Sequence, residues 1–189
     1  MTEVLEIVSL VSGIIFMIEQ IRQGKWLWYI ELVTSGSALI VAVSSHIWGN
    51  AIINVYYCVM AVVGLVQWKR FDAGTAKGET HLVKMTGRIG AISAAIFLTG
   101  GAIIWFAFQK TSDPYPFWDS LSLILGIIAC WWLTRSHLSN WYLWIVSDII
   151  MTCIYGAQGM VWMAILYGLY AASAIPGLIY WKKHGIYLS

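Results

Sequence analysis

Seven long apolar runs, joined by short polar segments, constrain this chain more strongly than any other feature of its sequence. Their boundaries fall near residues 4–20, 26–44, 50–68, 89–109, 117–134, 141–155 and 161–181. Most of them approach the roughly 20 residues that an α-helix needs to cross the hydrocarbon core of a bilayer. No run alternates as a strand of a membrane barrel does, and a spanning segment must pair its backbone polar groups internally. We therefore predict an all-α membrane protein with seven transmembrane helices.

Composition supports this class, because 60% of the 189 residues are hydrophobic and only 11% are charged. A formal net charge of +2 does not indicate a nucleic-acid-binding protein. Several of the twelve tryptophans stand at the ends of the apolar runs, where we expect them to anchor helices at the lipid headgroups. These anchors are Trp26, Trp28, Trp68, Trp118, Trp141 and Trp181.

The basic residues predict the orientation of the seven helices in the membrane. Ten of the eleven lysines and arginines fall on one side of the predicted spans, and the other side has only Lys110. The ten are Arg22, Lys25, Lys69, Arg70, Lys77, Lys84, Arg88, Arg135, Lys182 and Lys183. Because cytoplasmic loops are enriched in basic residues, we expect the amino terminus outside and the carboxyl terminus in the cytoplasm.

An internal repeat appears when the chain is shifted against itself, without a gap, so that Trp28 falls on Trp141. We call this shift the repeat offset. Other positions that match at this offset are Gly13 with Gly126, Arg22 with Arg135, Gly64 with Gly177 and Trp68 with Trp181. The offset predicts a three-helix bundle over residues 1–70 and a second over 117–189.

Residues 71–116 then contain a cytoplasmic loop and one linking helix, which gives a 3+1+3 parallel repeat. Repeat-built transporters hold their substrate at the interface between the repeats, near the middle of the membrane. Candidate ligand residues are therefore expected among the polar groups at that depth.

Asp148 is the most deeply placed ionisable residue in this arrangement. It follows Trp141 and Trp144 at helical spacing, so the two indoles and the carboxylate share one face of the sixth span. Indoles bind flat or cationic rings by stacking and cation–π attraction, and a carboxylate adds charge or a hydrogen bond. We interpret this face as the centre of a binding site for a small, water-soluble ligand. Interfacial anchoring of Trp141 and simple packing of Trp144 remain the alternatives.

Glu31 is a second carboxylate within a predicted span, and at the repeat offset it matches Trp144. It is a candidate ligand residue, with extension to the cytoplasmic surface or pairing with Lys25 as the alternatives. Further candidates lie on the second, third and seventh spans, where packing is the alternative for each aromatic ring. They are Trp28, Asn54, Tyr57, Tyr167 and Tyr170.

Four motifs of the second half stand in a characteristic order. They are the segment Tyr-Pro-Phe-Trp-Asp-Ser at 115–120, Trp141-x-x-Trp144-x-x-x-Asp148, Tyr167, and Gly177-x-x-x-Trp181. This order over seven spans resembles the Pnu vitamin transporters, which are best known for nicotinamide riboside uptake. The resemblance implies three-helix bundles similar to those of SWEET proteins, in a multi-pass protein of the bacterial cytoplasmic (inner) membrane. It also implies facilitated diffusion, with an intracellular kinase that phosphorylates the vitamin and traps it.

Departures from the family pattern bear on the substrate. Asp148 and Glu31 stand where nicotinamide riboside carriers commonly have Asn, and Ala61 and Pro176 stand where further Asn residues are expected. Thiamine has a thiazolium cation and an aminopyrimidine that suit two carboxylic acids beside indoles. We therefore expect thiamine as the first substrate, nicotinamide riboside as the second and riboflavin as the third.

Other function classes find less support in the sequence. An intramembrane enzyme needs a nucleophile with a base or a metal cluster, and no such group of residues assembles on the predicted helices. Its cysteines fall inside apolar runs without ligand-like spacing. We expect no enzymatic activity, cofactor, metal site or nucleic-acid partner; the lipid bilayer and the vitamin are the expected partners, and a homo-oligomer is left open. A seven-span receptor is the remaining alternative from another class.

Overall fold

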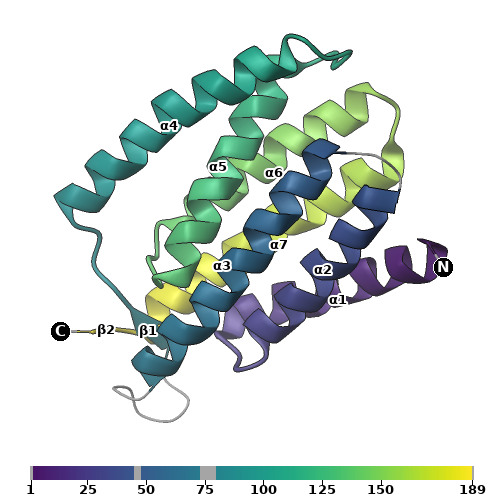
Figure 1. Ribbon diagram of the computed structural model, residues 1–189. Helices are drawn as coiled ribbons and strands as arrows, with labels where there is room; N and C mark the ends of the chain where they lie inside the picture. Colours follow the sequence, from purple (N-terminus) through teal and green to yellow (C-terminus); the bar gives the residue numbers. More distant parts are fainter. Residues whose placement is uncertain (1, 45–47, 73–79, 189) are drawn as a thin grey trace.

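The computed structural model of this protein describes residues 2–44, 48–72 and 80–188. Within these residues the chain forms seven helices and one pair of short strands (Figure 1). The elements are α1 (Thr2–Arg22), α2 (Leu27–Ser44), α3 (Trp48–Asp72), β1 (Thr80–Leu82), α4 (Gly87–Phe108), α5 (Pro116–Thr134), α6 (Asn140–Ala157), α7 (Val161–His184) and β2 (Gly185–Tyr187). All seven predicted spans are therefore helices, with ends within a few residues of the predicted boundaries.

Five of these helices, counted over the described residues, are long and apolar enough to cross a membrane. The five segments are Leu27–Ser44, Ala51–Phe71, Gly87–Phe108, Pro116–Thr134 and Met163–His184. Large apolar side chains such as Leu98, Ile103 and Phe106 are exposed on α4, as expected for a helix whose surroundings are lipid. The chain is therefore a multi-pass membrane protein.

The helices form two groups of three, with α4 lying outside them (Figure 1). Within the first group α2 packs against both α1 and α3, and within the second α6 packs against both α5 and α7. The two groups meet through α1 with α7 and through α3 with α5. α4 packs along α5, where the Trp132 indole donates a hydrogen bond to Ser93 Oγ at 3.0 Å. Each group thus has the same internal order and meets the other through its outer helices.

One end of the helices carries nearly all of the described basic residues, and we call it the basic end. There α1, α3, α5 and α7 finish and α2, α4 and α6 begin. Its basic residues are Arg22, Lys25, Lys69, Arg70, Lys84, Arg88, Arg135, Lys182 and Lys183, while Lys77 lies outside the described residues. β1 and β2 pair in parallel at this end, with Thr80 opposite Gly185 and Leu82 opposite Tyr187.

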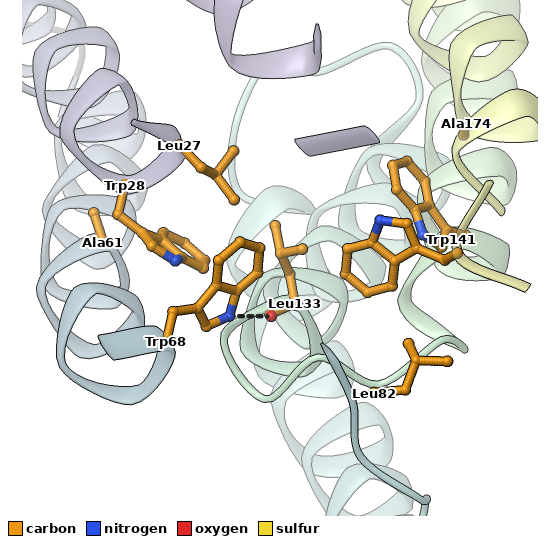
Figure 2. Close-up of a cluster of buried hydrophobic side chains, with 9 residues drawn as sticks. Leu27, Trp28, Ala61, Trp68, Leu82, Leu133, Trp141 and Ala174 are labelled. Carbon is orange, nitrogen blue, oxygen red and sulfur yellow. Dashed lines mark hydrogen bonds between the residues drawn. The ribbon is translucent and has the colours of Figure 1, made fainter. Parts of the chain in front are cut away.

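Four buried indoles lie toward the basic end and connect the two groups; we call them the tryptophan floor. They are Trp28, Trp68, Trp141 and Trp181. Trp28 meets Trp68 edge to face with ring centroids 5.2 Å apart, and Trp141 meets Trp181 in the same way at 5.4 Å. Trp68 donates its indole N–H across the interface to the carbonyl of Leu133 at 3.3 Å, as Figure 2 shows. Trp181 donates in the opposite direction to the carbonyl of Gln20 at 3.2 Å.

The prediction that these four tryptophans anchor the helices in the headgroups is therefore wrong. Each is no more than 4% exposed, whereas Trp26 and Trp118 are 55% and 50% exposed and fit the prediction. The physical reason is the partner available to the ring. Trp68 and Trp181 each reach a backbone carbonyl on the opposite group, which satisfies their N–H in the interior, and Trp28 and Trp141 pack edge to face on these two rings.

Glycines make room for the floor at two positions that match at the repeat offset. A Cβ at Gly64 would overlap the ring of Trp28, and a Cβ at Gly177 would overlap the ring of Trp141. A second matched pair of contacts occurs farther from the basic end. There a Cβ at Gly13 would lie 3.2 Å from the Tyr170 hydroxyl, and one at Gly126 would lie 3.3 Å from the Tyr57 hydroxyl. These packing contacts therefore recur at the same offset as the sequence matches.

We predict that Gly64→Ala and Gly177→Ala each lower stability by about 1–3 kcal/mol, because the added methyl group must displace a buried indole. Thermal unfolding of the purified protein in detergent measures this change. Gly36→Ala is the matched control, since nothing lies within 4 Å of a Cβ at that helical glycine. Equal melting temperatures for Gly64→Ala and Gly36→Ala would show that the indole packs less closely than described.

Candidate functional site

A cavity of about 720 Å³ lies between the two groups of helices. This volume falls within the range of small-molecule sites, roughly 300–1,000 Å³. Leu133 and the floor residues Trp28 and Trp141 lie at its basic end, and Asp113 and Asp119 lie toward the opposite end. All nine residues proposed from the sequence line it, namely Trp28, Glu31, Asn54, Tyr57, Trp141, Trp144, Asp148, Tyr167 and Tyr170. The structure therefore brings the sequence candidates together from both groups.

Asp148 lies on α6 and is 7% exposed. The neighbouring Ser147 fixes this part of α6 against α5, because its hydroxyl lies 2.9 Å from that of Ser122. Trp144, one turn earlier, is half-buried and lines the same cavity. The predicted face of indole and carboxylate is thus directed into a cavity and held there by an interhelical contact.

Three indole N–H groups in the cavity wall have no acceptor within the described part of the chain. They belong to Trp28, Trp141 and Trp144. Buried N–H donors are almost always hydrogen-bonded, so unpaired donors on residues that line a cavity are candidates to bind water or a ligand. The indoles of Trp68 and Trp181, which lie outside the cavity lining, are both paired. The unpaired indole donors among these five rings are thus the three that line the cavity.

Glu31 lies on α2 and is 8% exposed. Ser35, one turn later on the same helix, donates a hydrogen bond of 2.7 Å to Glu31 Oε1. Lys25 instead lies over the ring of Trp26, with Nζ 5.5 Å from its centroid. Neither extension to the surface nor pairing with Lys25 therefore describes Glu31. Its carboxylate belongs to the cavity.

The two carboxylates stand at positions that differ between the groups. At the repeat offset Glu31 corresponds to Trp144, and Ser35 corresponds to Asp148. Each group thus contributes one carboxylate and one neutral side chain at paired positions on its middle helix. The resulting cavity wall is chemically asymmetric, as a single asymmetric ligand requires.

The tyrosine candidates both line the cavity and pack against one another. Tyr167 stacks on Tyr155 with centroids 5.3 Å apart, and Tyr170 meets Tyr167 edge to face at 5.9 Å. Tyr57 and Tyr170 place their hydroxyls against helices of the opposite group, at Gly126 and Gly13. These side chains connect the groups as well as forming the wall. Asn54, the remaining candidate, is buried on α3.

Several lining residues were not expected to belong to the site. The sequence did not identify Ser35, Ser122, Ser147, Tyr155 or Asp119 as candidate ligand residues. The one available signal was the spacing of Ser35, one turn after Glu31. The serine pair between α5 and α6 depends on contacts between helices, which the sequence does not specify.

The charge of the cavity is one-sided. Its lining contains four acidic residues, Glu31, Asp113, Asp119 and Asp148, and no lysine, arginine or histidine among the described residues. A carboxylate in a low-dielectric wall attracts cations and donors and repels anions. The site is therefore suited to a neutral or cationic ligand with both hydrogen-bond donors and acceptors.

Comparison with known proteins places the chain in a family. The family model of the nicotinamide mononucleotide transporter matches residues 3–183. The riboflavin/roseoflavin transporter RibM of Streptomyces davaonensis is 25% identical over 180 residues, which cover 93% of this chain and 83% of RibM. The nicotinamide riboside transporter PnuC of Escherichia coli is 35% identical over 69 residues, 36% of this chain and 29% of that protein.

Two further comparisons extend over most of the chain. The nicotinamide riboside transporter PnuC of Neisseria mucosa is 22% identical, with 93% of this chain and 71% of that protein covered. The crystal structure of the vitamin B3 transporter PnuC matches the fold with a TM-score of 0.70 at 19% identity, and covers 95% of this chain and 80% of that one. These relatives are transporters, and the chain is a transporter rather than an enzyme. It belongs to the nicotinamide mononucleotide transporter family, the family of PnuC.

Proposed function

We propose that this protein carries nicotinamide riboside across the membrane by facilitated diffusion. The observation that carries the proposal is the cavity between the two helix groups, whose wall combines Glu31 and Asp148 with three unpaired indole N–H groups. A riboside supplies hydroxyl donors for the carboxylates, and hydroxyl, ring and carboxamide oxygens for the indole donors. Its pyridinium ring is flat and cationic, which suits stacking beside Trp144.

The charge of the wall favours the riboside over the mononucleotide named by the family model. A 5′-phosphate adds about 1.5 to 2 negative charges at neutral pH. Phosphate sites are built from Arg, Lys or helix amino termini, and the described cavity lining has four carboxylates without a basic side chain. A phosphate would therefore lose its hydration and meet repulsion from the wall.

Thiamine, the first substrate expected from the sequence, gains no support from the relatives, whose names give nicotinamide riboside and riboflavin. Thiamine also has fewer acceptors than a riboside for the three indole donors. Riboflavin is the second candidate, because the relative RibM aligns over 93% of this chain. It has a larger, uncharged ring system, so its binding would depend less on the carboxylates.

The proposed mechanism uses the 3+1+3 arrangement. Residues 1–70 and 117–189 are two SWEET-like bundles in a parallel repeat, and residues 71–116 provide the loop and the linking helix. Support comes from the matched contacts at the repeat offset, such as Trp28 on Gly64 and Trp141 on Gly177. A cavity between two such bundles is exposed alternately at each end when one bundle rocks against the other.

The same proposal assigns the cellular setting. The protein lies in the bacterial inner membrane with the basic end in the cytoplasm, where a vitamin kinase traps the substrate. The concentration of basic residues at one end supports this orientation.

Uptake into vesicles that contain the purified protein tests the function. Labelled nicotinamide riboside should enter and equilibrate, while the mononucleotide should enter no faster than into empty vesicles. An ionophore should leave the rate unchanged, because facilitated diffusion uses no ion gradient. Failure of the riboside to enter, or entry of the mononucleotide at an equal rate, would overturn the proposed substrate; thiamine and riboflavin are the competing solutes.

Reporter fusions test the orientation. A fusion at the carboxyl terminus should be active for a cytoplasmic reporter, and a fusion after Lys110 should be active only for an extracytoplasmic one. The physical reason is retention of the basic end on the cytoplasmic side. A cytoplasmic signal from the Lys110 fusion would reverse the assignment.

Asp148→Asn should weaken riboside binding by about 1.5–3 kcal/mol, roughly ten- to a hundredfold. The substitution keeps the size of the side chain and removes a charge-assisted hydrogen bond. Calorimetric titration of the purified protein measures it. Asp119→Asn is the control, because it removes a charge at the far end of the same cavity and should change affinity much less. Unchanged affinity in Asp148→Asn would make Asp148 a structural residue.

A further inference from the structure

A short segment at the basic end crosses beneath the tryptophan floor; we call residues 80–83 the strap. It consists of β1 and Val83 and precedes α4. Its residues Thr80, His81 and Leu82 are each no more than 2% exposed, which is unusual for a loop. The strap therefore belongs to the core of this end rather than to its surface.

The first helix group holds the strap through one side chain and two rings. Gln23 Oε1 accepts from the His81 backbone N–H at 2.9 Å, and Gln23 Nε2 donates to the His81 carbonyl at 3.0 Å. The His81 ring meets Trp68 edge to face at 5.0 Å and lies 5.1 Å from Phe71. Two hydrogen bonds between this group and the strap thus come from a single amide.

The second group holds the strap through backbone contacts. The Val83 N–H donates to the Ser136 carbonyl at 3.1 Å, and His137 Nδ1 lies 2.8 Å from the Val83 carbonyl. A carbonyl can only accept, so His137 carries its proton on Nδ1. β2, which continues directly from α7, pairs with β1, and the Leu188 N–H donates to the Leu82 carbonyl at 2.8 Å. Most of the backbone hydrogen bonds described for the strap therefore run to this side.

The two groups contact the strap through turns that occupy equivalent positions after α1 and α5. Gln23 follows α1 and Ser136 follows α5, and the two positions match at the repeat offset. They are the described non-glycine residues with a positive φ, 48° and 54° respectively. Such backbone is uncommon and persists where surrounding contacts determine it. Here the contacts include those with the strap.

Leu82 connects the strap with the floor. It is 1% exposed and belongs to the same buried cluster as the four floor tryptophans and Leu133 (Figure 2). The strap residues do not line the cavity, whereas Trp28, Leu133 and Trp141 do. The floor thus separates the cavity from the strap. Burial lowers the pKa of His81 to about 4, so its imidazole is neutral in this position at physiological pH.

We propose that the strap keeps the cavity closed at the basic end, and that the strap must release Gln23 before the cavity opens there. The strap bridges both groups directly below the floor, so the groups cannot separate at this end while both attachments hold. Release occurs at the first group, where one side chain makes both of the hydrogen bonds described above, and the strap then moves with α7 and β2. This inference rests on the proposed transport function, since a strap that closes one end has a role only if the cavity opens alternately at its two ends.

The access of a cavity cysteine to a membrane-impermeant thiol reagent tests this role of the strap, and the test needs no vitamin. Ser173→Cys provides the reporter next to Ala174, in a chain whose Cys58, Cys130 and Cys153 are replaced by alanine. Intact cells and inside-out membrane vesicles present opposite ends to the reagent. Lys110→Cys in the same background identifies the preparation that exposes the end opposite to the basic end.

Gln23→Ala should raise labelling of the reporter from the basic end roughly tenfold, because two hydrogen bonds to the closed gate are lost. Labelling from the other end should fall, because the open population moves from one side to the other. Leu82→Ala, which removes the contact with the floor, should act in the same direction. Gln109→Ala, an exposed glutamine beyond α4, is the matched control and should change neither rate.

If Gln23→Ala raised labelling of the reporter from both ends, the result would indicate general loosening and would overturn the proposed role of the strap. Unchanged labelling from both ends would overturn it as well. The outcome is independent of the substrate. If riboside uptake failed but labelling still rose at the basic end and fell at the other, the proposed vitamin would be rejected and the role of the strap retained. Normal uptake without any labelling change would do the reverse.

Discussion

The two helix groups depend on indole N–H groups that find carbonyl acceptors across their interface. In a bilayer, helices gain little from the hydrophobic effect when they associate, so packing and interhelical hydrogen bonds decide the arrangement. Trp68 bonds to the carbonyl of Leu133 and Trp181 to that of Gln20, each in the last turns of a helix in the opposite group. Since these carbonyls are near helix ends, they can accept a bond from outside the helix. The large rings fill the interface and leave the cavity above them.

The polar side chains of the cavity wall have the opposite requirement, because they need partners from water or a ligand rather than from the protein. A buried carboxylate without a cationic partner is costly, and polar groups within a membrane protein generally face water or a ligand. Glu31 has one hydrogen bond from Ser35, and the cavity gives both Glu31 and Asp148 a route to solvent or substrate. The indole donors in the cavity wall carry the same requirement. A ligand that satisfies all of these groups replaces several water contacts at once, which favours a small molecule rich in both donors and acceptors.

The helices and the two carboxylates could be predicted because length, hydropathy and depth are local properties of the sequence. The tryptophan floor could not be distinguished from headgroup anchors in this way, because both place Trp at the end of an apolar run. The additional signal was present in Gly64 and Gly177, each one helical turn before a floor tryptophan. A glycine at that spacing leaves room for a ring from a neighbouring helix, as Trp28 and Trp141 show. The strap was out of reach, because such short strands are stabilised by partners distant in sequence, as Gln23 is here.

The repeat offset separates two kinds of position. Positions that hold the structure together recur in both halves: the floor rings, the glycines packed against two of them, the tyrosines at Gly13 and Gly126, and the positive-φ turns at Gln23 and Ser136. The acidic residues on the middle helices do not recur, since Glu31 corresponds to Trp144 and Asp148 to Ser35. If the halves form the proposed repeat, the interface between them is self-complementary, so a matching contact satisfies both sides. A vitamin has no such symmetry. Under the proposed function, symmetry is therefore retained where the halves must move against each other and lost where they must recognise a single ligand.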